Sequence, residues 1–480
     1  GRFAMGGGAT TGDNNIAIGA NAGDALTSGY QNVLIGQNAG GQLTTAKENV
    51  VIGDGAYASA NTNENFAVVV GFNAATLLDG VDDVVAIGHS ALSTLVDANG
   101  NTAVGFQAGK VTTGAGNTYV GHKSGIGASG ADAGNVGVGF ETLKDVTNGG
   151  FNVAIGYQAG QNITSADECI AIGTNALNLA TLSQNSIAIG RNAMSGITTN
   201  VVSNVVAIGY GALQGVSGTT SGADGTVAIG KDAGKAITTG GNNTLMGDGV
   251  ADALTDGHDN VIIGSGAGTN TTSVGFSVII GRKAGQANLT AAADGTVAIG
   301  YEAGNAITSG TENVVVGFEA GKSTNTGDRN TYIGDTAAKA GTDASYNTVV
   351  GYQALQTNVD GNYNVAVGYK SMEDFEPAND AGYNTAVGAT SMKNSTTTSG
   401  SVAIGYGAMG EGTTTGDFNI AIGYSAGEDL TSGHNNVIIG KNAGKELTTA
   451  RENVIIGVGA YATANTSENF GVAIGFNAAT

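Results

Sequence analysis

The side chains that could do chemistry in this chain are four histidines, one cysteine and a scattered set of acidic residues. His89 and His122 occupy the same place in two repeats of the sequence, but a further repeat carrying Phe106 lies between them. A zinc ion needs its protein ligands to converge on one point, so this spacing does not predict a zinc site. The Gly-Gly-x-Gly-x-Asp pattern of calcium-binding β-rolls is missing. No cofactor is expected, and a few structural cations at the turns are left open.

Acidic residues are the other candidates for catalysis. A glycosidase needs two carboxyl groups about 5–10 Å apart on one surface. Here the 39 Asp and Glu residues are dispersed through segments of turn composition. Cys169 takes a place that asparagine holds in most repeats, which indicates a buried bystander and not a reactive thiol. The sequence therefore predicts no catalytic residue and no enzyme.

Composition excludes several classes of protein. Among 480 residues there are 83 glycines and one proline, and only 12% of residues are charged. A share of 41% hydrophobic residues is too high for a disordered linker. The formal net charge of −21 opposes binding to nucleic acid and to anionic lipid. No apolar run approaches the ~20 residues of a membrane span, so no membrane insertion is expected.

The elements that must position all these side chains are copies of one short string. Asn49-Val50-Val51-Ile52-Gly53 returns with small changes along the whole chain, for example as Asn453-Val454-Ile455-Ile456-Gly457. We call the closing glycine of each copy the anchor glycine, position 0, and count 28 of them, from Gly1 to Gly475. Most are 17 residues apart. This period is too short for a helical-pair repeat and predicts an all-β fold, a parallel β-solenoid with one repeat per coil.

Alternate residues before the anchor glycine are β-branched. Position −1 is Ile, Val or Met, and position −3 is Val, Ile or Thr. Alternation with a period of two in such residues is typical of a strand with one face inward. Position −1 is therefore predicted to form the core ladder, represented by Ile18, Ile35, Ile52, Ile155, Ile189, Ile299 and Ile456.

Position −2 should then point away from the core. It is Ala in about half of the copies and is otherwise Val, Leu, Ile, Tyr or Gly, with no charged residue. A strand that is apolar on both faces is usually buried on both faces. Position −2 is predicted to form an inter-chain stripe in a parallel homotrimer, and a flat monomeric solenoid is the alternative. The stripe is represented by Ala17, Val51, Ala154, Ala188, Ile262 and Ala403.

Two other columns have a structural and a functional interpretation. Asn at position −4, as in Asn32 and Asn436, could form a ladder of stacked amides or could read a ligand. Aromatic residues at position +1, as in Phe72 and Tyr157, could pack against a neighbouring chain or contact a sugar. The structural interpretation is favoured for both.

The domain organisation follows from the unbroken series of repeats. Residues 1–480 are predicted to form a single continuous solenoid. Residues 405–480 repeat residues 1–76 without a gap, at an offset of 404 residues, which indicates duplication of a long block. Neither end shows the polar cap that a solenoid needs. We expect the chain to be a slice of a longer fibre that continues end to end.

The string Asn185-Ser186-Ile187-Ala188-Ile189-Gly190 resembles the head repeat of trimeric autotransporter adhesins, and similar repeats occur in bacteriophage tail fibres and other surface fibres. The resemblance implies a left-handed parallel β-roll that trimerises through its strands. The repeat here, about 17 residues, is longer than the adhesin coil.

The function expected from these patterns is mechanical. We expect an extracellular structural fibre, on a cell surface or a virion, with a homotrimeric shaft and adhesion to surface glycans or host cells by its outward turns. A phage tail fibre or tailspike that binds or depolymerises glycans is the first alternative. An ice-binding solenoid is the second, suggested only by Thr-rich turns such as Thr44-Thr45 and Thr112-Thr113.

Overall fold

A computed structural model of the chain describes residues 3–7, 10–59, 63–78, 80–95, 98–127, 133–197, 202–215, 222–376, 382–463 and 469–479. These residues form an all-β parallel β-solenoid of about 25 turns with ~17 residues per turn. The helical structure among them is one 3-10 turn, η1 (Ala291–Ala293). The predicted fold class is confirmed.

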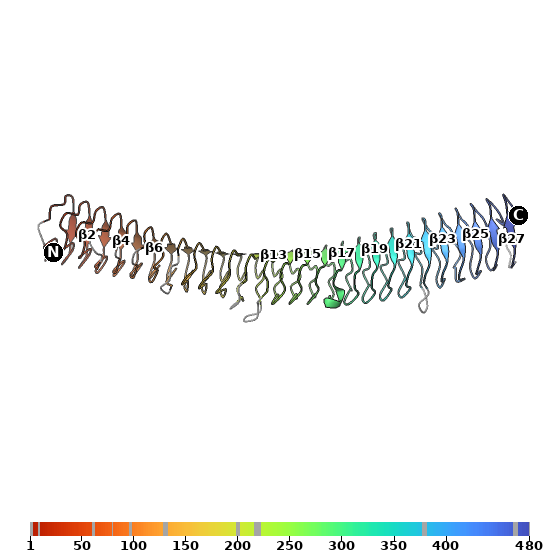
Figure 1. The fold of residues 1–480 in the computed structure, drawn as a ribbon, viewed down its shortest axis with the longest axis horizontal. Helices are drawn as coiled ribbons and strands as arrows, with labels where there is room; N and C mark the ends of the chain where they lie inside the picture. The colour runs from red at the N-terminus through yellow and green to blue at the C-terminus, as the bar shows by residue number, and fades with distance from the viewer. Residues whose placement is uncertain are drawn as a thin grey trace. The chain divides into compact units, whose positions relative to one another are not determined.

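Two compact units, Gly1–Asn242 and Asn243–Thr480, make up the chain. Within each unit, every strand has three residues and pairs in parallel with the strand of the next coil (Figure 1). That the two units form one continuous domain stays a prediction, as does the duplication. The strands of the first unit are β1 (Ile16–Ile18), β2 (Val33–Ile35), β3 (Val50–Ile52), β4 (Val68–Val70), β5 (Val85–Ile87), β6 (Thr102–Val104), β7 (Thr118–Val120), β8 (Val136–Val138), β9 (Val153–Ile155), β10 (Ile170–Ile172), β11 (Ile187–Ile189), β12 (Val206–Ile208) and β13 (Val227–Ile229). Those of the second unit are β14 (Thr244–Met246), β15 (Val261–Ile263), β16 (Val278–Ile280), β17 (Val297–Ile299), β18 (Val314–Val316), β19 (Thr331–Ile333), β20 (Thr348–Val350), β21 (Val365–Val367), β22 (Thr385–Val387), β23 (Val402–Ile404), β24 (Ile420–Ile422), β25 (Val437–Ile439), β26 (Val454–Ile456) and β27 (Val472–Ile474).

The register of the ladder places equal positions of successive repeats in contact. In the pair of β11 and β12, for example, Ala188 lies opposite Ala207 and Ile189 lies opposite Ile208. Neighbouring parallel strands are about 4.8 Å apart. Each position of the repeat therefore forms a column of side chains at that spacing within a unit.

A glycine follows each described strand, and its φ lies between +128° and +146°. L-residues rarely adopt this conformation. Contact with the next coil excludes a side chain as well, since a Cβ on Gly334 would lie 2.3 Å from the carbonyl oxygen of Gly351. Backbone conformation and close approach together explain why the column is glycine. Gly1 lies outside the described residues.

Several inward columns fill the interior of each coil. The middle residue of the strand, position −2, forms one of them, and positions +3 and +7 form two more. In one coil these are Ala188, Ala193 and Ile197, all of which are buried. Small and large apolar side chains thus pack together in the interior and leave little space for water.

The prediction assigned the two strand faces the wrong way round. The inter-chain stripe was predicted at position −2, but the structure buries this column inside the coil, with Ile262 0% exposed. The same holds for Val51, Ala154, Ala188 and Ala403, and Ala17 is half-buried. The predicted core ladder points outward instead and is half-buried or exposed. Its members are Ile18, Ile35, Ile52, Ile155, Ile189, Ile299 and Ile456.

The physical reason is the width of the coil. Both faces of the strand are apolar. The alternation of residue types along the strand therefore shows that it is a strand, but it does not show which face points into the coil. In this coil, Leu or Ile from position +7 already fills the centre, and the strand can contribute a residue as small as Ala188.

Candidate association face

The outward side chains of the strands form two parallel columns, at positions −3 and −1. In all 27 strands they are Val, Ile, Thr or Met, as in Val278 and Ile280 of β16. Their burial is partial or absent throughout. We call these two columns the association face. Apolar columns that continue over many coils exceed the isolated exposed residues found on most soluble proteins, and such patches mark interaction sites.

Aromatic rings line one edge of the association face, at position +1. In the first unit six rings follow one another in successive coils, with centroids 5.0–5.2 Å apart. They are Phe72, His89, Phe106, His122, Phe140 and Tyr157. The face of each inner ring is covered by its neighbours, so the column presents ring edges to its surroundings. Sugar recognition by stacking needs a free ring face, and this arrangement therefore favours packing against another apolar surface.

A second aromatic column, at position −5, lines the other edge. Phe151 and Phe418 are exposed there, and a cation covers some of the other rings. The Arg329 guanidinium lies 5.7 Å from the ring centroid of Tyr346, donates a hydrogen bond to its hydroxyl at 3.0 Å and pairs with Glu312 at 2.9 Å. Charged groups thus occur at the rim of the association face and not within it.

The asparagine column at position −4 points inward. Asn32 is fully buried, donates from Nδ2 to Oδ1 of Asn15 at 3.0 Å, and accepts the backbone N–H of Asn49 at 3.1 Å. Each buried amide thus satisfies polar groups of its own coil and of its neighbours. Because these side chains are buried and bonded within the protein, they cannot read a ligand from solution.

Cys169 lies in this asparagine column, and 1% of its surface is exposed. Burial raises the pKa of its thiol to about 11. A thiol that stays protonated at neutral pH is a poor nucleophile.

His89 and His122 lie in the ring stack on opposite sides of Phe106, 5.2 Å and 5.0 Å from its centroid. Among the described residues, no three His, Cys, Asp or Glu side chains gather closely enough to hold a metal ion.

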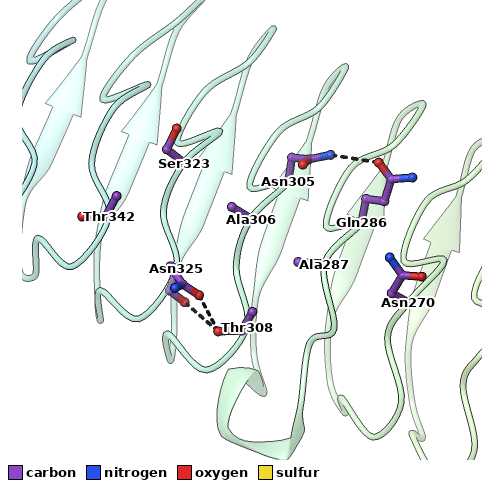
Figure 2. A pocket seen from close by; sticks show the side chains of 9 residues that line it. All are labelled: Asn270, Gln286, Ala287, Asn305, Ala306, Thr308, Ser323, Asn325 and Thr342. Atoms are coloured by element: carbon purple, nitrogen blue, oxygen red, sulfur yellow. Dashed lines mark hydrogen bonds between the residues drawn. The ribbon is translucent and has the colours of Figure 1, made fainter.

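A shallow polar groove of about 490 Å³ lies on the turns of the second unit (Figure 2). Small residues such as Ala287 and Ala306 form its floor. Asn305 donates from Nδ2 to Oε1 of Gln286 at 3.3 Å along one wall. None of the nine lining residues is titratable, so the groove offers no acid, base or charged nucleophile. The nine are Asn270, Gln286, Ala287, Asn305, Ala306, Thr308, Ser323, Asn325 and Thr342.

Carboxylates near this groove are paired with lysines. Lys322 bridges Glu302 at 2.6 Å and Glu319 at 2.7 Å, and Lys339 contacts Glu319 at 2.6 Å. Hydrogen bonds from Lys322 lower the pKa of both carboxyl groups. A general acid needs a raised pKa, so these carboxylates are unsuited to that role.

No helix in the described part of the chain is long and apolar enough to cross a membrane.

Sequence reasoning found the two apolar strand faces and the aromatic column at position +1, but it missed the stacking of the rings within the chain and the column at position −5. The signal was present, because aromatic residues recur at one position in successive repeats, as in Phe106, His122 and Phe140.

No family model, curated protein or solved structure gives a significant match to this chain.

Proposed function

We propose that the protein is a structural fibre protein whose solenoid shafts associate in parallel, as a homotrimer, through the association face. The observation that carries this proposal is the face itself, two outward columns without a charged residue on every described strand. Burial of apolar surface is the dominant favourable term in protein association. A solitary shaft would leave both columns in water on coil after coil.

A second copy of the chain suits this face better than a globular partner does. The face repeats once per coil with unchanged register, as in the pairs of β15 with β16 and of β25 with β26. Two parallel copies therefore match row by row, whereas a globular protein has no surface with this period. The resemblance of Asn185–Gly190 to adhesin head repeats supports the number three.

The same resemblance supports a location outside the cell, where the protein would be a surface filament or a virion fibre. The net charge of −21 favours solubility of a long shaft and opposes contact with nucleic acid or anionic membranes. Adhesion to surface glycans or host cells would then fall to the turns that point away from the association face.

The test is the mass of the native assembly. Analytical ultracentrifugation and native mass spectrometry should both give the mass of a trimer. Replacing outward residues in every second coil, with Ile263→Asp, Ile299→Asp and Ile333→Asp together, should give a monomer with unchanged far-ultraviolet circular dichroism. The three carboxylates would lie about 10 Å apart on the chain and would be forced into the apolar interface.

The matched control carries the same charges in the same coils, on the turns. Asn270→Asp, Ala306→Asp and Ala340→Asp together should leave the trimer intact. A monomeric wild-type chain would overturn the proposal, and so would an Ile-to-Asp variant that retains the wild-type mass.

A further inference from the structure

Tyrosines stack on tyrosines at both edges of the association face in the second unit. In the position −5 column, the rings of Tyr346 and Tyr363 are 4.7 Å apart and 1° from parallel. Tyr383 continues this stack, 5.0 Å from Tyr363 and 6° from parallel. The position +1 column contains the pairs Tyr352–Tyr369, at 5.5 Å, and Tyr406–Tyr424, at 5.2 Å.

Backbone hydrogen bonds between coils hold these rings together. The N–H of Tyr363 donates to the carbonyl of Ser345 at 3.1 Å, and the N–H of Tyr383 donates to the carbonyl of Asn362 at 3.1 Å. All three tyrosines of the column have a φ between +57° and +64°. The rings therefore leave equivalent backbone positions in the same direction, and they lie parallel to one another.

The stacked rings are also open to solvent. The three tyrosines of the position −5 column are 41–64% exposed, and those of the two position +1 pairs are 43–54% exposed. A small oxidant or a haem peroxidase can thus reach the phenols wherever no second chain covers the edges of the association face. Phenols that are this close and this accessible favour oxidative coupling, because a rotation of the rings is enough to bring two ortho carbons together.

We propose that the stacked tyrosines, above all Tyr346, Tyr363 and Tyr383, are sites of oxidative cross-linking that join successive coils of one chain through dityrosine. The oxidant is hydrogen peroxide acting through a haem peroxidase. Each of two phenols loses one electron and one proton, and the two phenoxyl radicals form a carbon–carbon bond between ortho carbons. The hydrogen on each of these carbons then moves to oxygen, and one peroxide is reduced to two waters.

A bond of this kind fixes one coil to the next. Tyr346 and Tyr363 are 17 residues apart, and Tyr363 and Tyr383 are 20 apart. A covalent link that closes such a loop restricts the unfolded chain and not the folded coil. Coupling within one chain requires no second chain, so it is separable from self-association.

The experiment treats the full chain with horseradish peroxidase and hydrogen peroxide. Digestion should yield linked peptides, each two hydrogen atoms lighter than the sum of its parts, that join Tyr363 to Tyr346 or to Tyr383. Tyr363→Phe should abolish both links, whereas Tyr346→Phe should abolish only the first. Tyr210→Phe is the matched control, because Tyr210 lies beside Arg191 and not beside a tyrosine, and it should leave both links intact.

A mixture of ¹⁴N-labelled and ¹⁵N-labelled chains separates coupling within a chain from coupling between chains. Linked peptides of a single isotope support the proposal whether the chain is a monomer or a trimer. Peptides that combine the two isotopes would overturn it. Equal yields from the folded chain and from the chain in urea would also overturn it, since the coil would then have no part in bringing the rings together.

Discussion

The side-chain carbonyl of Asn330 accepts two hydrogen bonds from Asn347 of the next coil, one from its backbone N–H at 2.9 Å and one from its side-chain amide at 3.3 Å. The Nδ2 of Asn330 in turn donates to Oδ1 of Asn313 at 3.1 Å and to the carbonyl of Ala344 at 2.7 Å. These asparagines are almost completely buried. Each one therefore serves its own coil and both neighbouring coils.

Asn330→Ala should weaken the structure locally, because the buried N–H of Asn347 loses its acceptor. An unsatisfied buried group costs about 1–3 kcal/mol. Hydrogen exchange at Asn347 should accelerate roughly tenfold to a hundredfold. Asn330→Ser is the control, since Ser401 holds the same position and its Oγ accepts the N–H of Asn419 at 3.0 Å. If Ala and Ser accelerate exchange equally, the loss of an acceptor for the Asn347 N–H is not what weakens the structure.

The anchor glycine should tolerate no side chain. In Gly334→Ala, the new Cβ would lie 2.3 Å from the carbonyl oxygen of Gly351, at a φ of +142°. Strain in this region alone costs on the order of 1–3 kcal/mol, and the clash adds to it. The variant should melt at a clearly lower temperature and become cleavable by protease in that coil.

Gly295→Ala separates strain from clash. Gly295 also has a positive φ, +76°, but nothing lies within 4 Å of a Cβ placed there. Gly295→Ala should lower the free energy of unfolding by about 1 kcal/mol. Equal losses of thermal stability in the two variants would mean that contact between anchor glycines of adjacent coils does not determine the residue type.

Neighbouring residues of β16 should respond very differently to truncation. Ile279 is fully buried in the coil and Ile280 is half-buried on the association face. Ile279→Ala should cost about 2–5 kcal/mol at any protein concentration, because it leaves a cavity. Ile280→Ala should lower the melting temperature only where the chain is concentrated enough to associate. The reverse pattern would restore the strand orientation that the sequence suggested.

The sequence predicted the strand, the period and the parallel stack, because glycine and β-branched residues recur at fixed positions. It did not predict which side of the strand is inward. Ala188 and Ile189 are both apolar, and the residues that share the interior, such as Ile197 of the same coil, decide which of them fits. That decision depends on the path of the whole coil. A periodic pattern within the strand does not contain it.

The position of Cys169 leads to two predictions. Its N–H donates to Oδ1 of Asn152 at 3.0 Å, and its thiol lies 3.4 Å from the carbonyls of Asp167 and Ser183. Because burial raises the thiol pKa to about 11, the folded chain should react slowly with maleimide at pH 8, and the chain in urea should react quickly. Fast reaction of the folded chain would show that this coil opens readily.

The raised pKa of the Cys169 thiol also makes the stability of the folded chain depend on pH. An unfolded thiol has a pKa of about 8.5, so the unfolded chain releases this proton at a lower pH than the folded chain does. The folded state then binds more protons, and the contribution of Cys169 to stability, complete below about pH 8.5, should be lost as the pH rises towards 11. Cys169→Asn should remove this loss, because an amide does not titrate and can join the asparagine column. The check is the melting temperature of both chains between pH 7 and pH 10, and parallel curves would contradict a protonated, buried thiol.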